Sequence, residues 1–170
     1  MFQKAVERVV SVEGGYSDHE ADRGGSTKFG ITQQTLAQFR GVPVSDDDVR
    51  DLTEEEAHRI YKKFYWDVMN LDSVKSEKIA EVLFDQAVNR GVVPVVKYMQ
   101  QVLGLKADGK VGIVTITALN SAPEQLTCLL LIEKAQIEYV RIVERNPSQI
   151  VFLEGWIRRT HSLFDVVFRS

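Results

Sequence analysis

The stretch from Val12 to Thr32 constrains the fold of this 170-residue chain more than any other segment. It follows an amphipathic pattern, beginning at Phe2, that is typical of a helix, and it opens with the acid Glu13. The two glycines at 14–15 predict the end of that helix, because glycine tolerates the left-handed conformation of a helix terminus. Residues 16–31 lack helical periodicity. We expect irregular chain or a small β-hairpin there, with a turn at 24–25 and a short strand at 28–31.

The rest of the chain has the patterns of helices. Good N-cap or first-turn residues predict helix starts at Thr32, Thr53, Ser76, Pro94 and Pro123, as well as after the N-P pair at 146–147. A short helix is expected over 113–119. The aromatic residues at 61, 65 and 66 lie at helical spacing, which favours a place in the core over a sugar-binding platform. The predicted fold class is therefore mainly α, with one small insert near the N-terminus.

Composition excludes several classes of function. The net charge is −3, and the charges of both signs are interspersed, so we expect no nucleic-acid partner. No apolar run approaches the length of a membrane span, so we expect no membrane insertion. The single cysteine, Cys128, lies in an apolar run and is expected to be buried. The N-terminal residues lack a signal-peptide core, so we expect synthesis in the cytoplasm.

Two acids in the opening stretch suit glycosidic bond cleavage. That reaction needs a protonated acid at the leaving oxygen and a second carboxylate that stabilises the cation or activates water. Glu13 and Asp22 are the candidates, and the Thr27 hydroxyl is a candidate for holding the water. From the residues alone, an ordinary helix stop followed by a surface turn is the favoured explanation. A metal site over 18–22 is less favoured, because only one histidine is local; we expect no metal and no cofactor.

Two sequence motifs favour a glycosidase site over an ordinary helix stop and surface turn. The sequence E-G-G-Y at 13–16, followed by D-x-G-G-x-T-x-x-G-I at 22–31, resembles the signature of glycoside hydrolase family 108. That family is similar to phage-type lysozymes, and its members are N-acetylmuramidases. The resemblance implies a lysozyme-like helical fold with Glu13 as the catalytic acid. It also implies that Asp22 and Thr27 complete a Glu-Asp-Thr triad.

The second half of the chain extends the resemblance. F-D-Q-A-V-N-R-G at 84–91 resembles a further segment of the family. The segments at 100–112 and 155–159 resemble the predicted peptidoglycan-binding region that follows, with a departure at Ile113, where proline is usual. The implied organisation is a catalytic region over 1–91 and a peptidoglycan-binding helical region over 92–170, packed together. Tyr16, Asp85 and Asn89 become candidates for substrate binding; packing or capping roles for the same three side chains stay open.

The resulting hypothesis is a peptidoglycan hydrolase. It would cleave the β-1,4 bond between N-acetylmuramic acid and N-acetylglucosamine, with peptidoglycan glycan strands as its partner. We expect an endolysin-like role for a phage, prophage or cellular wall-remodelling protein that reaches the wall after release or export. The alternatives are a non-catalytic peptidoglycan-binding or secretion-accessory protein and a metal-dependent peptidase using the acids at 18–22.

Overall fold

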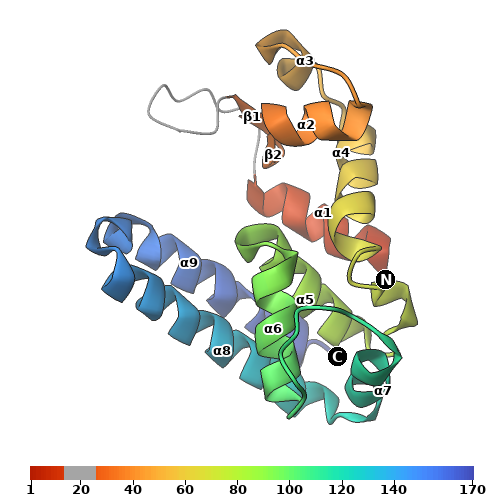
Figure 1. The fold of residues 1–170 in the computed structure, drawn as a ribbon, viewed down its shortest axis with the longest axis vertical. Helices are drawn as coiled ribbons and strands as arrows, with labels where there is room; N and C mark the ends of the chain where they lie inside the picture. The colour runs from red at the N-terminus through yellow and green to blue at the C-terminus, as the bar shows by residue number, and fades with distance from the viewer. Residues whose placement is uncertain (14–25) are drawn as a thin grey trace. The chain divides into compact units, whose positions relative to one another are not determined.

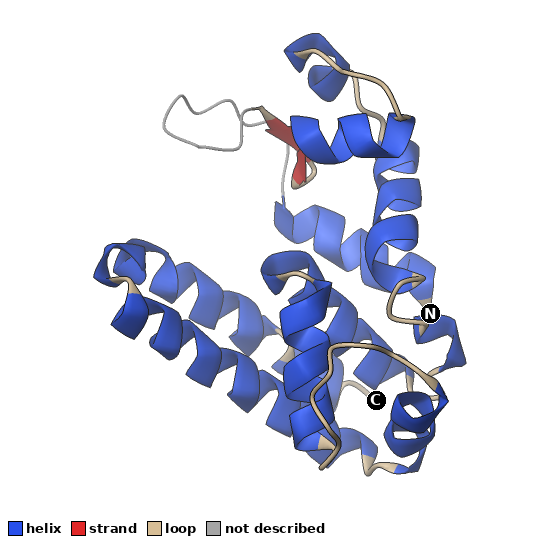
Figure 2. Cartoon of the chain, in the orientation of Figure 1, coloured by secondary structure: helices blue, strands red, loops and turns tan. Residues whose placement is uncertain are grey.

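The computed structural model describes residues 1–13 and 26–170. The described chain forms two compact units, residues 2–64 and residues 65–170, with Met1 grouped with the second. Both are built mainly from helices, and Figure 2 shows that the described strands are confined to one small hairpin. The predicted mainly α class with a small hairpin near the N-terminus is confirmed.

The N-terminal unit combines four helices with the hairpin (Figure 1). Its elements are α1 (Phe2–Glu13), β1 (Thr27–Lys28), β2 (Ile31–Thr32), α2 (Gln33–Arg40), α3 (Asp46–Arg50) and α4 (Glu54–Tyr61). The strands pair antiparallel, with Thr27 opposite Thr32 and Lys28 opposite Ile31. Helix α1 buries Ala5, Val6, Val9 and Val10. These positions recur every three or four residues, so one face of the helix enters the core.

The expected strand over 28–31 is interrupted by the turn of the hairpin at Phe29 and Gly30, with Lys28 and Ile31 paired on either side of it. Phe29 and Gly30 both have positive φ, 52° and 71°. Positive φ at both central residues is the requirement of the type I′ turn, whose twist matches that of the strands it joins. A bulky residue rarely adopts this conformation, so the sequence alone favoured an extended Phe29. The turn expected at 24–25 lies outside the described residues.

Capping residues fix where the helices of this unit begin. The Thr32 hydroxyl accepts the Thr35 N–H, so the second strand leads directly into α2. The Thr53 hydroxyl likewise accepts the Glu56 N–H at the start of α4. A reciprocal capping box begins α3, a helix that the sequence analysis did not predict.

The C-terminal unit is a packed set of helices. A π-helical turn, η1 (Lys62–Trp66), links the two units. The remaining elements are η2 (Leu71–Ser73), α5 (Glu77–Arg90), α6 (Val92–Val102), α7 (Ile113–Ser121), α8 (Glu124–Arg145), η3 (Pro147–Gln149), α9 (Ile150–Ser162) and α10 (Phe164–Phe168). The single final helix expected after Pro147 is divided at Leu163, which is buried.

Helix α5 is the centre of this unit. It packs against α6, α8 and α10, and nine consecutive residues, 79–87, are buried. Phe84 lies edge-on to Trp66, with ring centroids 5.5 Å apart. About one turn before Phe84 in the same helix, the Glu81 carboxylate pairs with Arg169 at 2.8 Å. The sequence-based boundary at 91/92 therefore falls between two helices of one compact unit, whereas the units divide at 64/65.

Among the described residues, no helix has both the length and the apolar character that a membrane crossing requires.

The packing of α5 predicts which fragments fold. A fragment of residues 65–170 should unfold cooperatively on heating, because it keeps α5. A fragment of residues 92–170 should melt without a sharp transition. It loses several buried apolar side chains at about 1.5–3 kcal/mol each, which together rival a domain's whole stability of about 5–15 kcal/mol. Circular dichroism melting of both fragments checks this. An equally sharp transition in the shorter fragment would show that α5 is dispensable.

Candidate active site

Glu13 is the last residue of α1, and its side chain is half-buried. The helix presents its apolar face to the core through Val6, Val9 and Val10. Because the helix is anchored in this way, the position of the Glu13 backbone is fixed by packing. A carboxyl group with a fixed position can deliver a proton to a fixed point, which is what general acid catalysis requires.

The turn of the hairpin lies directly against the Glu13 side chain. A Cβ added to Gly30 would lie 2.8 Å from Glu13 Oε2 and 2.9 Å from Glu13 Cγ. It would also lie 2.9 Å from the Tyr61 hydroxyl oxygen. Any side chain at position 30 would therefore displace one of these groups, and Gly30 is required for space as well as for its positive φ.

Tyr61 fixes the turn from the other side. Its ring is fully buried at the end of α4, and its hydroxyl donates a hydrogen bond of 2.6 Å to the carbonyl oxygen of Phe29. The ends of α1 and α4 and the turn of the hairpin therefore meet at one point. The core role expected for Tyr61 is confirmed, but its hydroxyl also holds the turn beside Glu13, which the sequence analysis missed.

The hairpin is held at its base by α3. Ser26 is buried, and its hydroxyl donates to the Asp46 carboxylate at 2.7 Å. The Lys28 ammonium donates to the Arg50 carbonyl oxygen at 2.6 Å. Both contacts place the first strand against this short helix, so the hairpin is supported at its base as well as at its turn.

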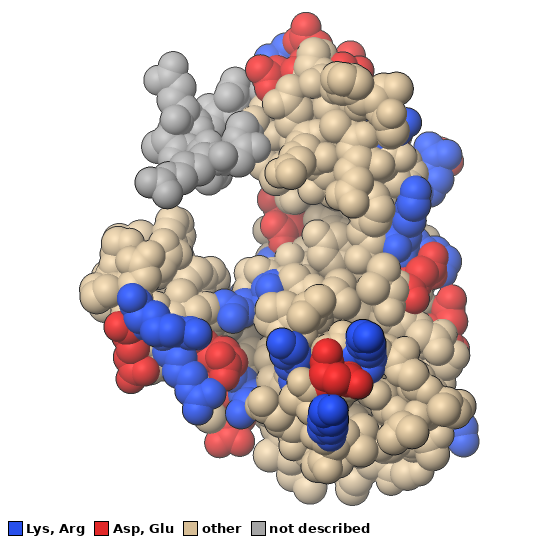
Figure 3. Space-filling view, viewed as in Figure 1, with Lys and Arg blue, Asp and Glu red and all other residues tan. Residues whose placement is uncertain are grey.

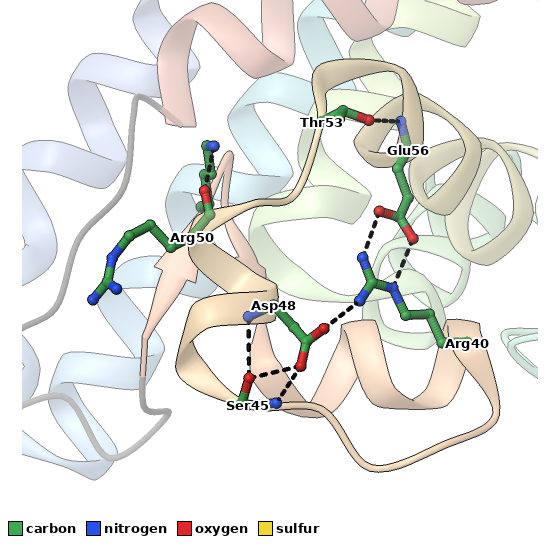
Figure 4. Close-up of polar contacts among 7 residues, drawn as sticks. Arg40, Ser45, Asp48, Arg50, Thr53 and Glu56 are labelled. Carbon is green, nitrogen blue, oxygen red and sulfur yellow. Dashed lines mark hydrogen bonds and ion pairs between the residues drawn. The ribbon is translucent and has the colours of Figure 1, made fainter.

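Arg40 joins the three helices that surround the hairpin (Figure 4). Its guanidinium makes two hydrogen bonds of 2.9 Å to the Glu56 carboxylate of α4 and one of 2.9 Å to Asp48 of α3. The hydrogen bond from Arg40 lowers the pKa of Glu56, and the hydrogen bonds from Ser45 lower the pKa of Asp48. The bidentate geometry fixes α2 relative to α4.

The structure describes four of the predicted site residues: Glu13, Thr27, Asp85 and Asn89. Thr27 is half-buried in β1, in the same hairpin whose turn contacts Glu13. Tyr16 and Asp22 lie outside the described residues. The acids at 18–22, proposed as an alternative metal site, lie there too. Among the residues that are described, no group of three metal-binding side chains is found.

Asp85 and Asn89 belong to the C-terminal unit, and both contact the helices that follow α5. Arg159 of α9 donates to the Asp85 carboxylate at 3.0 Å, and Asp85 is only 1% exposed. The Tyr139 hydroxyl of α8 donates to Asn89 Oδ1 at 2.6 Å. Their spacing of four residues puts both side chains on one face of α5. Within this unit, that face holds α8 and α9 to α5.

Cys128 is buried, as expected, and burial raises the pKa of its thiol to about 12. It is therefore protonated at neutral pH and unsuited to nucleophilic chemistry.

The close approach at Gly30 predicts a specific loss of stability. Gly30→Ala should lower the free energy of unfolding by roughly 2–4 kcal/mol, from left-handed strain together with overpacking against Glu13. Gly41→Ala is the matched control. Gly41 has nearly the same φ, 74°, but nothing within 4 Å of an added Cβ, so only the strain of about 1–2 kcal/mol applies. Urea unfolding measures both, and equal losses would contradict the close approach.

The Arg40 pair predicts a dependence of stability on pH. The folded pKa of Glu56 lies below its unfolded value, so the pair's stabilisation is present above the unfolded pKa of about 4.3 and is lost as pH falls through the lowered folded pKa. Glu56→Gln should therefore cost about 1–2 kcal/mol at pH 7 and progressively less below pH 4.

Melting curves from pH 7 to pH 3 measure this difference. Glu55→Gln, in the same first turn, is the control; Glu55 is exposed. A cost for Glu56→Gln that does not change with pH would show that the ion pair contributes nothing.

Comparison with known proteins finds two family models and a solved structure that match the chain. The family model described as Glycosyl hydrolase 108 matches residues 6–91, and the one described as Predicted Peptidoglycan domain matches residues 94–161. Among solved structures, the chain is similar to SagA of Brucella abortus. The TM-score is 0.84 and the sequence identity 29%, over 99% of this chain and 97% of that chain. No curated protein matches the sequence.

These matches support a peptidoglycan hydrolase at the level of the family, and they confirm the resemblance drawn from the motifs. The first match covers half of the chain and includes Glu13, the hairpin and all of α5. With this coverage, the chain belongs to glycoside hydrolase family 108.

Proposed function

We propose that the protein hydrolyses the β-1,4 bond between N-acetylmuramic acid and N-acetylglucosamine in peptidoglycan, with Glu13 as the general acid. The observation that carries the proposal is the packing of the Glu13 side chain against Gly30, the residue of the turn that has no side chain. The bare backbone at Gly30 leaves no Cβ beside the carboxyl group. Membership of a glycoside hydrolase family and the match to a peptidoglycan domain supply the substrate class.

In this mechanism, Glu13 protonates the glycosidic oxygen as the bond from that oxygen to C1 breaks. The sugar ring then carries positive charge, which a second carboxylate stabilises. We assign that role to Asp22, which takes the proton of the attacking water if the reaction inverts the anomeric centre. Thr27 holds this water by its hydroxyl. The distance between the two carboxyl groups decides the stereochemistry, with about 6.5–9.5 Å expected for inversion.

Tyr16, Asp85 and Asn89 are the proposed substrate-binding residues, and the contacts of Asp85 and Asn89 suggest different roles for these two. Asp85 is almost fully buried in an ion pair with Arg159, so we favour a positioning role for it over direct contact with sugar. Asn89 is half-buried, and its amide oxygen already accepts from Tyr139, which leaves the amide nitrogen as the donor available to an N-acetyl group. Tyr16 follows the acid closely in sequence and is proposed to contact the sugar.

The proposal predicts that Glu13→Gln abolishes glycan cleavage without unfolding the protein. Glutamine keeps the shape of the side chain but cannot donate a proton, so the release of reducing ends from purified wall should fall by about 10²–10⁴-fold. Glu7→Gln is the control, because Glu7 lies on the exposed side of the same helix. Mass spectrometry of the released muropeptides identifies the bond. A folded Glu13→Gln protein that still clears the wall would refute the assignment.

The same assay separates the alternatives. A non-catalytic wall-binding or secretion-accessory protein would sediment with the wall and release no reducing ends. A metal-dependent peptidase would produce new amino termini and lose activity with a chelator. Lysis of permeabilised cells, with loss of lysis in Glu13→Gln, would support the endolysin-like role.

A further inference from the structure

Among the cavities of the C-terminal unit, two lie near the loop that follows α6. The first, of about 430 Å³, is lined by the loop at 105–112 and the start of α7. The second, of about 280 Å³, is lined by Arg90 at the end of α5, by residues of α6 and by Glu138 of α8. Figure 3 shows basic side chains gathered on the surface over α6 and the loop that follows it. Four cations line the two cavities, and we call them the basic face: Arg90, Lys97, Lys106 and Lys110.

The two cavities adjoin each other at the tip of the loop. A Cβ added to Gly109 would lie 3.2 Å from Val93 Cγ1 and 3.3 Å from Lys97 Cε. Both of these α6 side chains line the second cavity, while the residues on either side of Gly109 line the first. The basic face is therefore one continuous surface rather than two separate depressions.

The cations of this face outnumber its acids, because each cavity is lined by two cations and one acid. Both acids also accept hydrogen bonds from other groups. Asp108 Oδ1 accepts the Lys110 N–H at 2.9 Å and the Gln100 amide at 2.8 Å, and these two bonds lower the pKa of Asp108. Glu138 pairs with Arg141 at 2.6 Å. Among the residues that the structure describes, no carboxylate lies within 4 Å of the Lys97 ammonium.

Arg90 adds an unsatisfied donor. Its guanidinium carbon lies 5.3 Å from the centroid of the Tyr139 ring, a cation–π contact that holds the head group in place. Its Nε atom is buried and has no hydrogen-bond partner within the described part of the chain. Buried donors without a partner are uncommon, and the residue that carries this one lines the second cavity.

The loop of the basic face is held in a single conformation by Gln100. This side chain is 2% exposed, donates to the Lys110 carbonyl oxygen at 2.9 Å and accepts the Gly109 N–H at 2.9 Å. The loop has no regular secondary structure of its own, so these bonds replace those of a helix or strand. A surface that is already ordered loses little entropy when it binds.

The chemistry of peptidoglycan indicates what this face recognises. The glycan strand is uncharged, because its sugars are N-acetylated and its lactyl group is linked to peptide. The stem peptides carry free carboxylates at the glutamate, at the terminal alanine and, where the diamino acid is diaminopimelate, at that residue too. We propose that the basic face binds the carboxylates of peptidoglycan stem peptides, so that the second half of the chain recognises peptide while Glu13 acts on glycan. This inference rests on the proposed function for its choice of polymer.

Binding to insoluble wall tests the inference without depending on catalysis. All variants are made in the Glu13→Gln background, so that the wall stays intact during the measurement. Lys97→Gln with Lys110→Gln removes one cation from each cavity. Lys75→Gln with Arg158→Gln is the matched control, because it makes the same change in charge at exposed positions of the same unit. Circular dichroism checks that each variant is folded.

The basic-face variant should bind intact wall about tenfold more weakly, through the loss of two charge-assisted contacts, and the control should bind normally. The protein with an unsubstituted basic face should also bind about tenfold more weakly to glycan from which an amidase has removed the stem peptides. A soluble stem tetrapeptide should shift the amide resonances of Gly109 and Lys110, and the same peptide with its carboxylates amidated should not.

Several outcomes would overturn the inference. Equal binding by the basic-face variant and the control would show that the net charge matters and the site does not. Undiminished binding to peptide-free glycan would assign recognition to the sugars. Loss of binding on removal of phosphate polymers from the wall, with stem peptides intact, would assign the face to phosphate. An active Glu13→Gln enzyme would refute the proposed general acid while leaving these binding results unaffected.

Discussion

The contact between Gly30 and Glu13 is the constraint on which the N-terminal unit depends. Three elements meet there, and each requires something different of the turn. Helix α1 needs space for its terminal carboxylate, Tyr61 needs a carbonyl oxygen in reach of its hydroxyl, and the hairpin needs two residues of positive φ. Only glycine at position 30 meets the first and third conditions together. Phe29 then accepts an unfavourable conformation, which the hydrogen bond from Tyr61 stabilises.

Local signals in the sequence predicted much of the fold, because helix ends are determined by nearby residues. The hydroxyl groups of Thr32 and Ser76 begin α2 and α5, and Gly91 ends α5, as expected. The prediction of one continuous strand over 28–31 was wrong at Phe29 and Gly30, because the conformation of Phe29 depends on Tyr61, which lies 32 residues further along the chain. Helix α3 was missed because it is only five residues long and has no apolar period to detect.

Some residues of the candidate site could be predicted from the sequence, and others could not. The position of Glu13 at the end of a helix followed from periodicity and the glycines after it, and its proposed role came from the family motif. Tyr61 and Arg40 could not be assigned from the sequence, because what they do depends on tertiary contacts with Phe29 and Glu56. The four-residue spacing of Asp85 and Asn89 is equally compatible with binding sugar and with binding helices, and only the structure identifies Arg159 and Tyr139 as their neighbours.

Helix α5 forms much of the core of the C-terminal unit, and its C-terminal end also contributes a residue to the proposed binding surface. Its sequence falls within the hydrolase family match, yet its side chains form the core of the unit that contains the peptidoglycan domain. One face carries Asp85 and Asn89, which bind α9 and α8, and its last residue, Arg90, lines the second cavity of the basic face. The ring of Tyr139 contacts Arg90 while its hydroxyl bonds Asn89. The helix that holds this unit together therefore also positions a cation of its proposed binding surface, so a substitution at Asn89 that moves Tyr139 would alter wall binding as well as stability.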